Sequence, residues 1–203
     1  MSDGLIIALA LALVVLGRRR NEPSGEWPSG WTWPVPDLVV KGVRWPSEIS
    51  QEYRDTATHA HLGVDIMFRS PSPPPTYSVP NGVEVPIVAA RAGTLWSVSL
   101  SPRGWQVVID HGPPWATYYQ HLSSIDPVLV AASAAGQTGE ARSAAPLQLA
   151  AGQRLGVMGY DPLDGNRVVH LHFAVWYGGA GDSASIDPRK AMSKWPKQTF
   201  MIP

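Results

Sequence analysis

The chain of 203 residues contains no cysteine. This absence excludes disulfide bonds, thiolate zinc sites and cysteine nucleophiles, so any transition metal must be held by histidine, aspartate or glutamate. Charge is also scarce, because only 16% of the residues are charged and the formal net charge is zero. A chain without a basic excess has no electrostatic affinity for a phosphate backbone, and the composition therefore argues against a nucleic-acid partner.

Turn-forming residues, in contrast, are abundant. The chain contains 19 glycines and 20 prolines, which is high for a helical protein and favours a turn-rich, mainly β domain. Its length fits one domain with extensions and is sufficient to bury a substantial core.

Residues 1–20 differ from the rest of the chain. Residues 4–17 (GLIIALALALVVLG) are uninterrupted apolar sequence, and three arginines follow at residues 18–20. As a helix, residues 4–17 span about 21 Å, less than the roughly 30 Å hydrocarbon core, although snorkelling arginines and a thinned bilayer allow a short span. The acidic start and the basic flank do not fit a cleaved signal peptide. The sequence therefore predicts an apolar transmembrane helix that anchors the protein in a lipid membrane, with a core or partner helix as the alternative.

Residues 21–36 (NEPSGEWPSGWTWPVP) are expected to form a linker because they are rich in proline, glycine and serine. The linker contains Trp27, Trp31 and Trp33, which we expect to pack on the folded domain rather than at a membrane interface. Residues 37–203 are predicted to be that domain.

From residue 37 onward, short apolar runs alternate with turn signals, a pattern typical of strands. The runs expected to be strands are residues 83–91, 94–100, 105–111, 115–122, 153–159 and 168–177. Their close spacing predicts an antiparallel sheet, rolled or layered. Residues 69–82 are too proline-rich for a strand and are expected to be a surface loop. Residues 126–152 are an insertion rich in small residues, for which a partly helical structure is one alternative.

Two histidines interrupt the apolar run VVHLHFAVW at residues 168–176. Residues i and i+2 of a strand share one face, so His170 and His172 are expected side by side, with Leu171, Phe173 and Val175 on the opposite face. One histidine in a strand is usually a core residue with satisfied hydrogen bonds. Two on one face need several polar partners or a metal.

Two further motifs contain candidate metal ligands. HLGVD places His61 and Asp65 four residues apart, and both residue types bind zinc. YYQHLSS places His121 on an expected strand, where Tyr119 would share its face. Each motif alone is weak evidence, because H-x-x-x-D is usually a surface turn and a lone histidine is usually structural. The helical HExxH zinc motif is absent.

The order of these motifs resembles that of the LytM/lysostaphin-type zinc endopeptidases, which cut peptide cross-bridges in bacterial peptidoglycan. The similarity consists of H-x-G-x-D at residues 61–65, Y-x-H-L-S at 119–123 and H-L-H-F-x-V at 170–175, supported by IVAARAGTL (87–95), VVIDHG (107–112), AGQRLGVMG (151–159) and IDPRKAM (186–192). It covers about residues 33–195. The resemblance implies a mainly β peptidase domain, with an antiparallel or rolled sheet and long loops.

The resemblance also implies a role for each of five side chains. His61, Asp65 and His172 match the zinc ligands of the family, and His121 and His170 match the catalytic residues that act on the water and the transition state. Three protein ligands leave zinc an open position, which is typical of a catalytic site. The implied function is zinc-dependent cleavage of peptidoglycan cross-links. The alternative is a non-catalytic module that binds peptidoglycan or activates a partner hydrolase.

The chain departs from the family pattern in places. The family usually has Gly-Pro directly before H-x-H, where this chain has Val168 and Val169. Long loops lie between the motifs, so the cross-link that is cleaved stays open. His59 is a competing candidate ligand, and His111 is expected to be structural.

Two settings fit the predicted anchor. The enzyme would be tethered in a bacterial cell envelope, or it would be a lysin in a bacteriophage virion that contains a membrane, together with other virion components. The compact layout and the lack of a standard secretion signal favour the virion. The three arginines oppose transfer of the C-terminal side across a membrane, so the orientation stays open.

Overall fold

The computed structural model describes residues 23, 26–56, 60–71, 73, 76–139 and 145–203. The predicted anchor at residues 1–20 and the candidate ligand His59 lie outside the described residues, so both stay predictions. Among the helices of the described ranges, none is long and apolar enough to span a bilayer.

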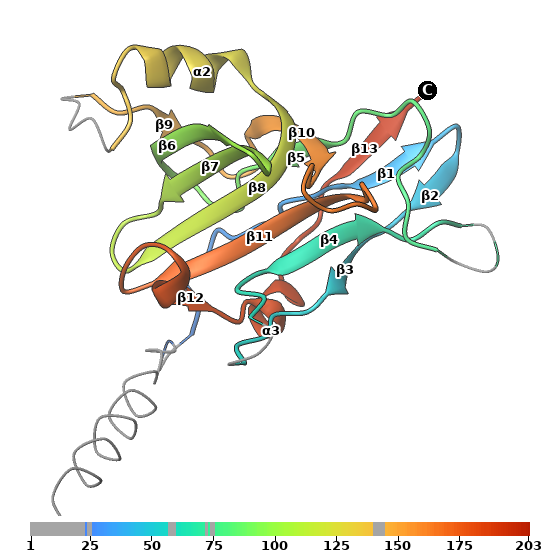
Figure 1. The fold of residues 1–203 in the computed structure, drawn as a ribbon, viewed down its shortest axis with the longest axis horizontal. Helices are drawn as coiled ribbons and strands as arrows, with labels where there is room; N and C mark the ends of the chain where they lie inside the picture. Colours follow the sequence, from blue (N-terminus) through green and yellow to red (C-terminus); the bar gives the residue numbers. More distant parts are fainter. Residues whose placement is uncertain (1–22, 24–25, 57–59, 72, 74–75, 140–144) are drawn as a thin grey trace, which may run out of the picture.

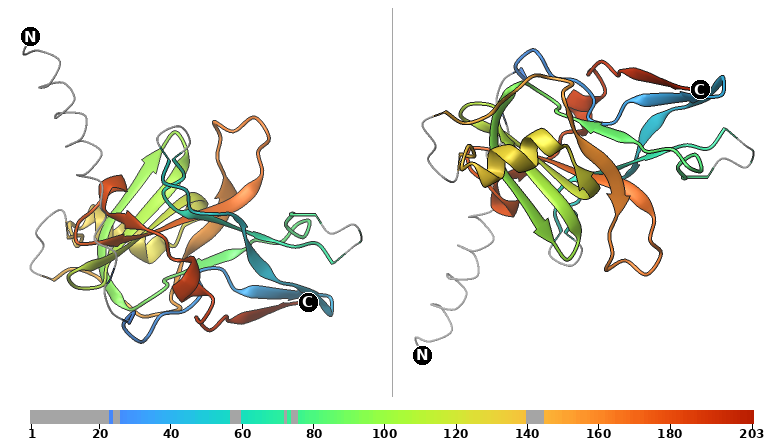
Figure 2. Two further views of the ribbon diagram at one scale, coloured as in Figure 1. Left: turned by 90° about the horizontal axis from the view of Figure 1, so that it is seen from below. Right: turned by 90° about the horizontal axis from the view of Figure 1, so that it is seen from above.

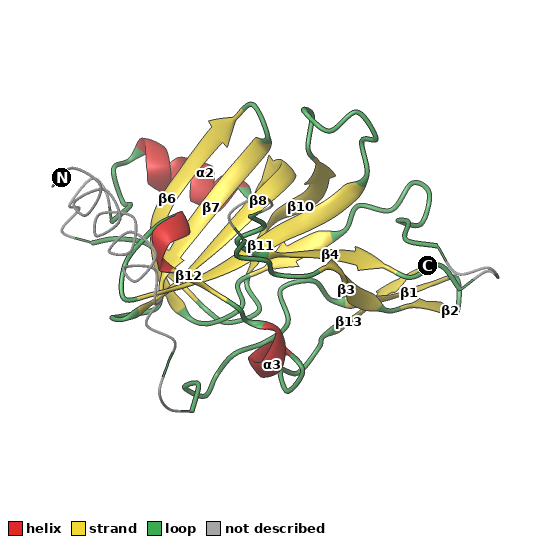
Figure 3. Cartoon of the chain, turned by 60° about the horizontal axis from the view of Figure 1, so that its bottom comes forward, coloured by secondary structure: helices red, strands yellow, loops and turns green. Residues whose placement is uncertain are grey.

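Most of the described strands belong to one large sheet (Figures 1 and 3). Its members are β3 (Ser47–Gln51), β4 (Val64–Phe68), β5 (Pro86–Val88), β6 (Gly93–Ser101), β7 (Gly104–Asp110), β8 (Trp115–Ile125), β9 (Gln148–Leu149), β10 (Arg154–Tyr160), β11 (Val169–Tyr177) and β12 (Ser185–Ile186). Their order is β3-β4-β11-β10-β8-β7-β6-β9, with β12 beside β11, β5 beside β10 and an additional β11–β8 pairing. The pairings are antiparallel, which confirms the predicted antiparallel sheet.

A second, three-stranded sheet was not predicted. It consists of β1 (Asp37–Val40), β2 (Val43–Trp45) and β13 (Thr199–Ile202), and Figure 1 shows it at the right of the molecule. β1 pairs antiparallel with β2 but parallel with β13, so the last strand lies beside the first. Strands this short carry little periodicity, and only tertiary contacts bring residues 37–40 and 199–202 together.

The predicted strands are largely present as β6, β7, β8, β10 and β11. The predicted strand at residues 83–91 is too long, because it contains only β5. Its last residues bond elsewhere: the Ala89 amide donates to the Gln153 carbonyl, and the Ala90 amide donates to the Tyr119 hydroxyl. The described part of residues 69–82 contains no strand beyond an isolated bridge at Tyr77, in agreement with the predicted loop.

Helix α2 (Pro127–Ala134) occupies the first part of the insertion at residues 126–152. Asp126 caps its N-terminus, because the carboxylate accepts a hydrogen bond from the Val128 amide at 3.1 Å. Proline at the first helical position is compatible with the missing amide donor. The helix buries Leu129 in the main core and contacts β6 (Figure 2).

The main core lies on one face of the large sheet. On β11, Leu171, Phe173 and Val175 are fully buried in this core, whereas His170 and His172 lie on the opposite face. The predicted division of β11 into an apolar and a histidine face is therefore confirmed. Short helix α3 (Arg189–Met192) closes the core near the C-terminus through Met192.

The tryptophans of the predicted linker pack on the domain, as expected. Trp31 and Trp33 are each 5% exposed. The Trp31 ring stacks on Trp195 with centroids 4.7 Å apart, and the Trp27 ring lies 4.7 Å from that of Trp115. Indoles buried to this extent dominate local packing energetics, so the N-terminal stretch is part of the core.

His111 belongs to a polar network beneath these rings. Its Nδ1 faces the Ala92 carbonyl at 2.9 Å and its Nε2 faces the Thr117 hydroxyl at 2.8 Å. The Thr117 hydroxyl in turn lies 3.1 Å from the hydroxyl of buried Tyr119. Both ring nitrogens therefore have protein partners, in agreement with the structural role predicted for His111. Burial lowers the pKa of His111 to about 4 against the opposing hydrogen bond to Ala92, and Arg91 lowers it further while Asp110 raises it.

This network predicts acid sensitivity. The folded protein disfavours His111 protonation, so stability is fully present above the ordinary pKa of 6.5 and is lost as the pH falls toward about 4. One such group contributes a slope of about 1.4 kcal/mol per pH unit within that window. Urea unfolding of the metal-free protein across the window should show this loss, and His111→Gln should remove part of the slope. An unchanged slope in the variant would contradict the assignment.

Candidate metal centre

Three donor atoms converge on the face of the sheet opposite the core. Asp65 Oδ1 lies 3.0 Å from His61 Nε2 and 3.0 Å from His172 Nδ1, and the two nitrogens are 3.2 Å apart. They form a nearly equilateral triangle of one carboxylate and two imidazole donors. Among the described residues, this group is the one able to hold a metal ion.

Strand pairing places two of the three donors. Asp65 on β4 lies directly opposite His172 on β11 in the antiparallel register, and directly opposed residues of such a pair point to the same face. The pairs on either side, Ile66 with Leu171 and Val64 with Phe173, turn their side chains into the core. A shift of one residue would exchange the two sets.

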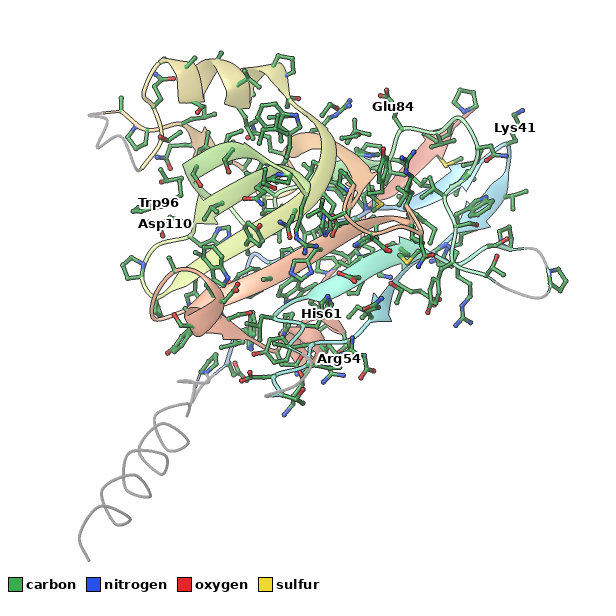
Figure 4. The ribbon with its side chains drawn as sticks, viewed as in Figure 1. Lys41, Arg54, His61, Glu84, Trp96 and Asp110 are labelled. Carbon is green, nitrogen blue, oxygen red and sulfur yellow. The ribbon has the colours of Figure 1, made fainter. Side chains whose placement is uncertain are left out.

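His61 reaches the site from the segment before β4, on the lower side of that strand in Figure 4. Two backbone hydrogen bonds of 2.8 Å join His61 to Arg54. The His61 ring places Nδ1 2.9 Å from the Glu52 carbonyl. A carbonyl only accepts, so Nδ1 carries a proton and Nε2 is the nitrogen that faces the triangle, where a metal ion would take the place of its proton. This second hydrogen bond orients the ring as outer-shell partners do for metal-binding histidines.

Gly63 makes room for the third donor. A Cβ at this position would lie 2.7 Å from His172 Nε2 and 2.7 Å from the Phe173 carbonyl oxygen. Both distances are far below contact distance, so a side chain here would displace the His172 ring or separate β4 from β11. Gly63 of the H-x-G-x-D motif is thus required because the His172 ring and the Phe173 carbonyl leave no space for a side chain.

The electrostatics of the triangle favour an ionised carboxylate. Burial alone raises the pKa of Asp65, but hydrogen bonds with His172 and His61 outweigh it and hold the pKa far below its usual 3.8. For His61, burial lowers the pKa, yet the hydrogen bond and charge of Asp65 outweigh burial and raise it above 6.5. A negative carboxylate between two imidazoles is a suitable environment for a divalent cation.

The donor set fits zinc. Zinc binds imidazole nitrogen and carboxylate oxygen at about 2.0–2.1 Å in a tetrahedron, which separates neighbouring ligand atoms by about 3.3 Å. The donor separations of 3.0–3.2 Å are close to that value. Three donors leave a fourth position for water or substrate, as in catalytic zinc sites.

The structure brings His121 and His170 next to the triangle. Their ring centroids are 4.7 Å apart, and the His121 ring lies 6.1 Å from that of His172. His170 Nε2 is 3.9 Å from the second carboxylate oxygen of Asp65. All five residues named by the sequence therefore form one cluster, while their individual roles stay predictions.

Backbone carbonyls fix the tautomers of both flanking histidines. His121 Nδ1 donates to the Arg103 carbonyl at 2.8 Å, and His170 Nδ1 donates to the Val168 carbonyl at 2.8 Å. In both rings Nδ1 is engaged and Nε2 is left for chemistry. Burial lowers the pKa of His121 to about 4, against the opposing hydrogen bond to Arg103, so this ring is neutral near pH 7.

His121 and Tyr119 do not share a face, which corrects the expectation from strand alternation. Tyr119 and Leu122 both lie in the core, although they are three residues apart on β8. The β7–β8 register shifts between Trp105 and Val107, so β8 contains an extra residue, and His121 has a left-handed φ of 68°. A β-bulge of this kind redirects a side chain, and here it turns His121 toward the face that carries Asp65 and His172.

Sequence reasoning missed two charged residues at this site. Arg103 and Asp161 form an ion pair beside His121. Asp161 is 6% exposed, which is unusual for a carboxylate. The sequence signal was limited to an arginine in the turn SPRG and an aspartate after the strand ending at Tyr160, and neither motif indicates contact with the other.

The antiparallel sheet with the His-Asp-His group on one face is that of the LytM/lysostaphin type of peptidase fold, and solved structures confirm the fold. A chain in the SpoIIIAH–SpoIIQ complex has a TM-score of 0.52 and 16% identity, covering 80% of this chain and 99% of that one. A Ruminococcus gnavus ATCC 29149 chain assigned as a glycyl-glycine endopeptidase lytM has a TM-score of 0.59 and 17% identity, covering 87% of this chain and 65% of that one.

Lysostaphin, solved by NMR, has a TM-score of 0.50 and 17% identity, covering 77% of this chain and 56% of that one. No protein-family model and no curated protein matches the sequence. At these identities the likeness shows the fold, which is the mainly β fold that the motif order implied.

We predict that Gly63→Ala weakens zinc binding by about 10- to 100-fold. This is the loss of metal affinity typical when a residue that orients a metal ligand is mutated. The added Cβ collides with the His172 ring. Competitive titration with a chromogenic chelator measures the affinity. Gly165→Ala is the matched control, because a Cβ there meets nothing within 4 Å. Equal affinities for the two variants would contradict the proposed geometry.

Proposed function

We propose that the protein is a zinc-dependent endopeptidase that hydrolyses peptide cross-links of bacterial peptidoglycan. The observation that carries the proposal is the triangle of His61, Asp65 and His172 beside two histidines whose Nδ1 atoms are tied to backbone carbonyls. The fold shared with lysostaphin and with a chain assigned as a glycyl-glycine endopeptidase supports the substrate class.

Zinc, when bound, lowers the pKa of a coordinated water toward neutrality and polarises the scissile carbonyl. His61, Asp65 and His172 would hold it. His121 is the proposed base, because its Nδ1–H is committed to the Arg103 carbonyl and its Nε2 is free to accept a proton from water.

His170 is the proposed proton donor. Its Nδ1 donates to the Val168 carbonyl, and its Nε2 lies 3.9 Å from Asp65 Oδ2, so a proton on Nε2 would lie near a negative carboxylate. An N–H at Nε2 can donate to the developing oxyanion or to the leaving amine. The unlike surroundings of the two rings thus support a division into acceptor and donor.

A second candidate is a non-catalytic module that binds peptidoglycan or a protein partner. The likeness to a chain of the SpoIIIAH–SpoIIQ complex, which covers nearly all of that chain, favours this alternative. The complete donor set argues for catalysis instead, because a module without catalysis has no need of both a metal site and two oriented histidines. Full zinc occupancy without cleavage of any peptidoglycan would establish the alternative.

Two substitutions on β11 test the division of roles. His172→Ala should lose zinc, because it removes one of three donors. His170→Ala should retain zinc and lower kcat by about 10²- to 10⁴-fold, the usual contribution of a positioned acid or base. Metal content by mass spectrometry and release of fragments from purified peptidoglycan measure both effects. A chelator should abolish activity and zinc should restore it.

Wild-type turnover by His170→Ala would refute the role of His170 as proton donor. The proposed zinc site would be unaffected by that result. Fragments identified by mass spectrometry would also show which cross-link is cut.

We further propose that residues 1–20 tether the enzyme to a lipid membrane, in a bacterial envelope or in a membrane-containing virion. The apolar run at residues 4–17 supports this proposal. Recovery of the protein in purified, nuclease-treated phage particles is expected for the virion. Recovery only in envelopes of uninfected cells would exclude it, and full extraction by carbonate would exclude a spanning anchor.

A further inference from the structure

Two separate loops hold the two flanking histidines. The carbonyl that accepts from His121 belongs to Arg103, in the turn between β6 and β7. The carbonyl that accepts from His170 belongs to Val168, at the end of the loop between β10 and β11. The spacing of the two rings therefore depends on how these two loops are placed relative to each other.

One ion pair joins the loops. The Arg103 guanidinium contacts the Asp161 carboxylate through Nη1 and Oδ2. Asp161 is the first residue after β10, and its side chain is 8% exposed, whereas that of Arg103 is 53% exposed. The other carboxylate oxygen of Asp161 accepts a hydrogen bond from the Leu163 amide at 2.9 Å. The carboxylate thus organises its own loop with one oxygen and holds the neighbouring turn with the other.

Each loop is also ordered by itself. The Ser101 hydroxyl donates to the Gly104 carbonyl at 3.1 Å and accepts from the Arg103 amide at 3.1 Å. In the other loop, backbone bonds run from the Asp164 amide to Asp161 and from the Arg167 amide to Asp164. The ion pair is therefore not needed to form either loop, and its contribution is their relative position.

Close packing against two glycines restricts movement of the His121 backbone. A Cβ at Gly159 would lie 2.6 Å from the His121 carbonyl oxygen, and one at Gly104 would lie 3.3 Å from its Cα. The bulged residue is thus enclosed between β10 and β7, so its ring direction depends on the Arg103 carbonyl.

We propose that Arg103 and Asp161 are positioning residues, which form a latch that sets the distance between the His121 and His170 rings. The proposal rests on the proposed function for its effect on turnover. Neither residue is required to touch the substrate or the metal. Misplacement of catalytic groups by about 1 Å can cost 10²-fold in rate, so a single ion pair between the loops is sufficient to affect turnover.

The test is a double-mutant cycle in the full-length, zinc-loaded protein in detergent, with Asp161→Asn, Arg103→Met and the double variant. Each single variant should lower kcat by about 10- to 100-fold, with KM for a soluble peptidoglycan fragment and zinc content unchanged. The double variant should be no slower than the slower single variant, because residues that act as a unit are not additive.

Arg44→Met is the matched control. Arg44 is an exposed arginine paired at 2.8 Å with the buried carboxylate of Asp37, in the three-stranded sheet and not in the sheet that carries Asp65 and His172. It should destabilise the protein to a similar extent and leave kcat unchanged. Equal losses of kcat in Arg44→Met and Arg103→Met would show a general stability effect and overturn the proposal. Multiplicative losses in the double variant would also overturn it.

A readout independent of activity separates this proposal from the proposed function. In ¹⁵N-histidine spectra of the zinc-loaded protein, Asp161→Asn should accelerate exchange of the His121 Nδ1 proton with water and leave that of His61 unchanged. If the unmodified protein cleaves no peptidoglycan, the proposed function fails. The exchange rate then tests by itself whether Arg103 and Asp161 position the His121 ring. An exchange rate unchanged by Asp161→Asn would refute it.

Discussion

The triangle of His61, Asp65 and His172 depends on the register between β4 and β11. Because Asp65 lies opposite His172, the carboxylate and an imidazole meet on one face, while flanking apolar pairs fill the core on the other. The core thereby fixes the site, since a slip of one residue would bury the ligands and expose the apolar set. Gly63 completes this constraint by leaving the space that the His172 ring occupies.

Regular strand geometry supplies the two histidines of β11, but β8 needs an irregularity. Strict alternation would leave His121 on the face of Tyr119, in the core. The extra residue in β8 and the left-handed conformation of His121 break the alternation and turn this ring to the face of Asp65 and His172. Backbone carbonyls of Arg103 and Val168 then orient the two flanking rings through their Nδ1 atoms. Main-chain carbonyls thus hold one nitrogen of each ring, and the Nε2 atoms are left for the proposed chemistry.

Aromatic packing attaches the N-terminal stretch to the domain. Four indoles, those of Trp27, Trp31, Trp115 and Trp195, lie within 6 Å of at least one other ring of the group. They connect the stretch after the predicted anchor to the start of β8 and to the C-terminal segment.

The sequence by itself determined the strands with clear apolar periodicity, the two faces of β11 and the five residues of the cluster, because these follow from local spacing and from motif order. Tertiary structure alone decided the β4–β11 register, the bulge at His121, the parallel pairing of β1 with β13 and the contact between Arg103 and Asp161. The two strand pairings and the ion pair join residues far apart in the chain, and the bulge appears only in the register between β7 and β8. No local pattern encodes which partner a strand or a charge will meet.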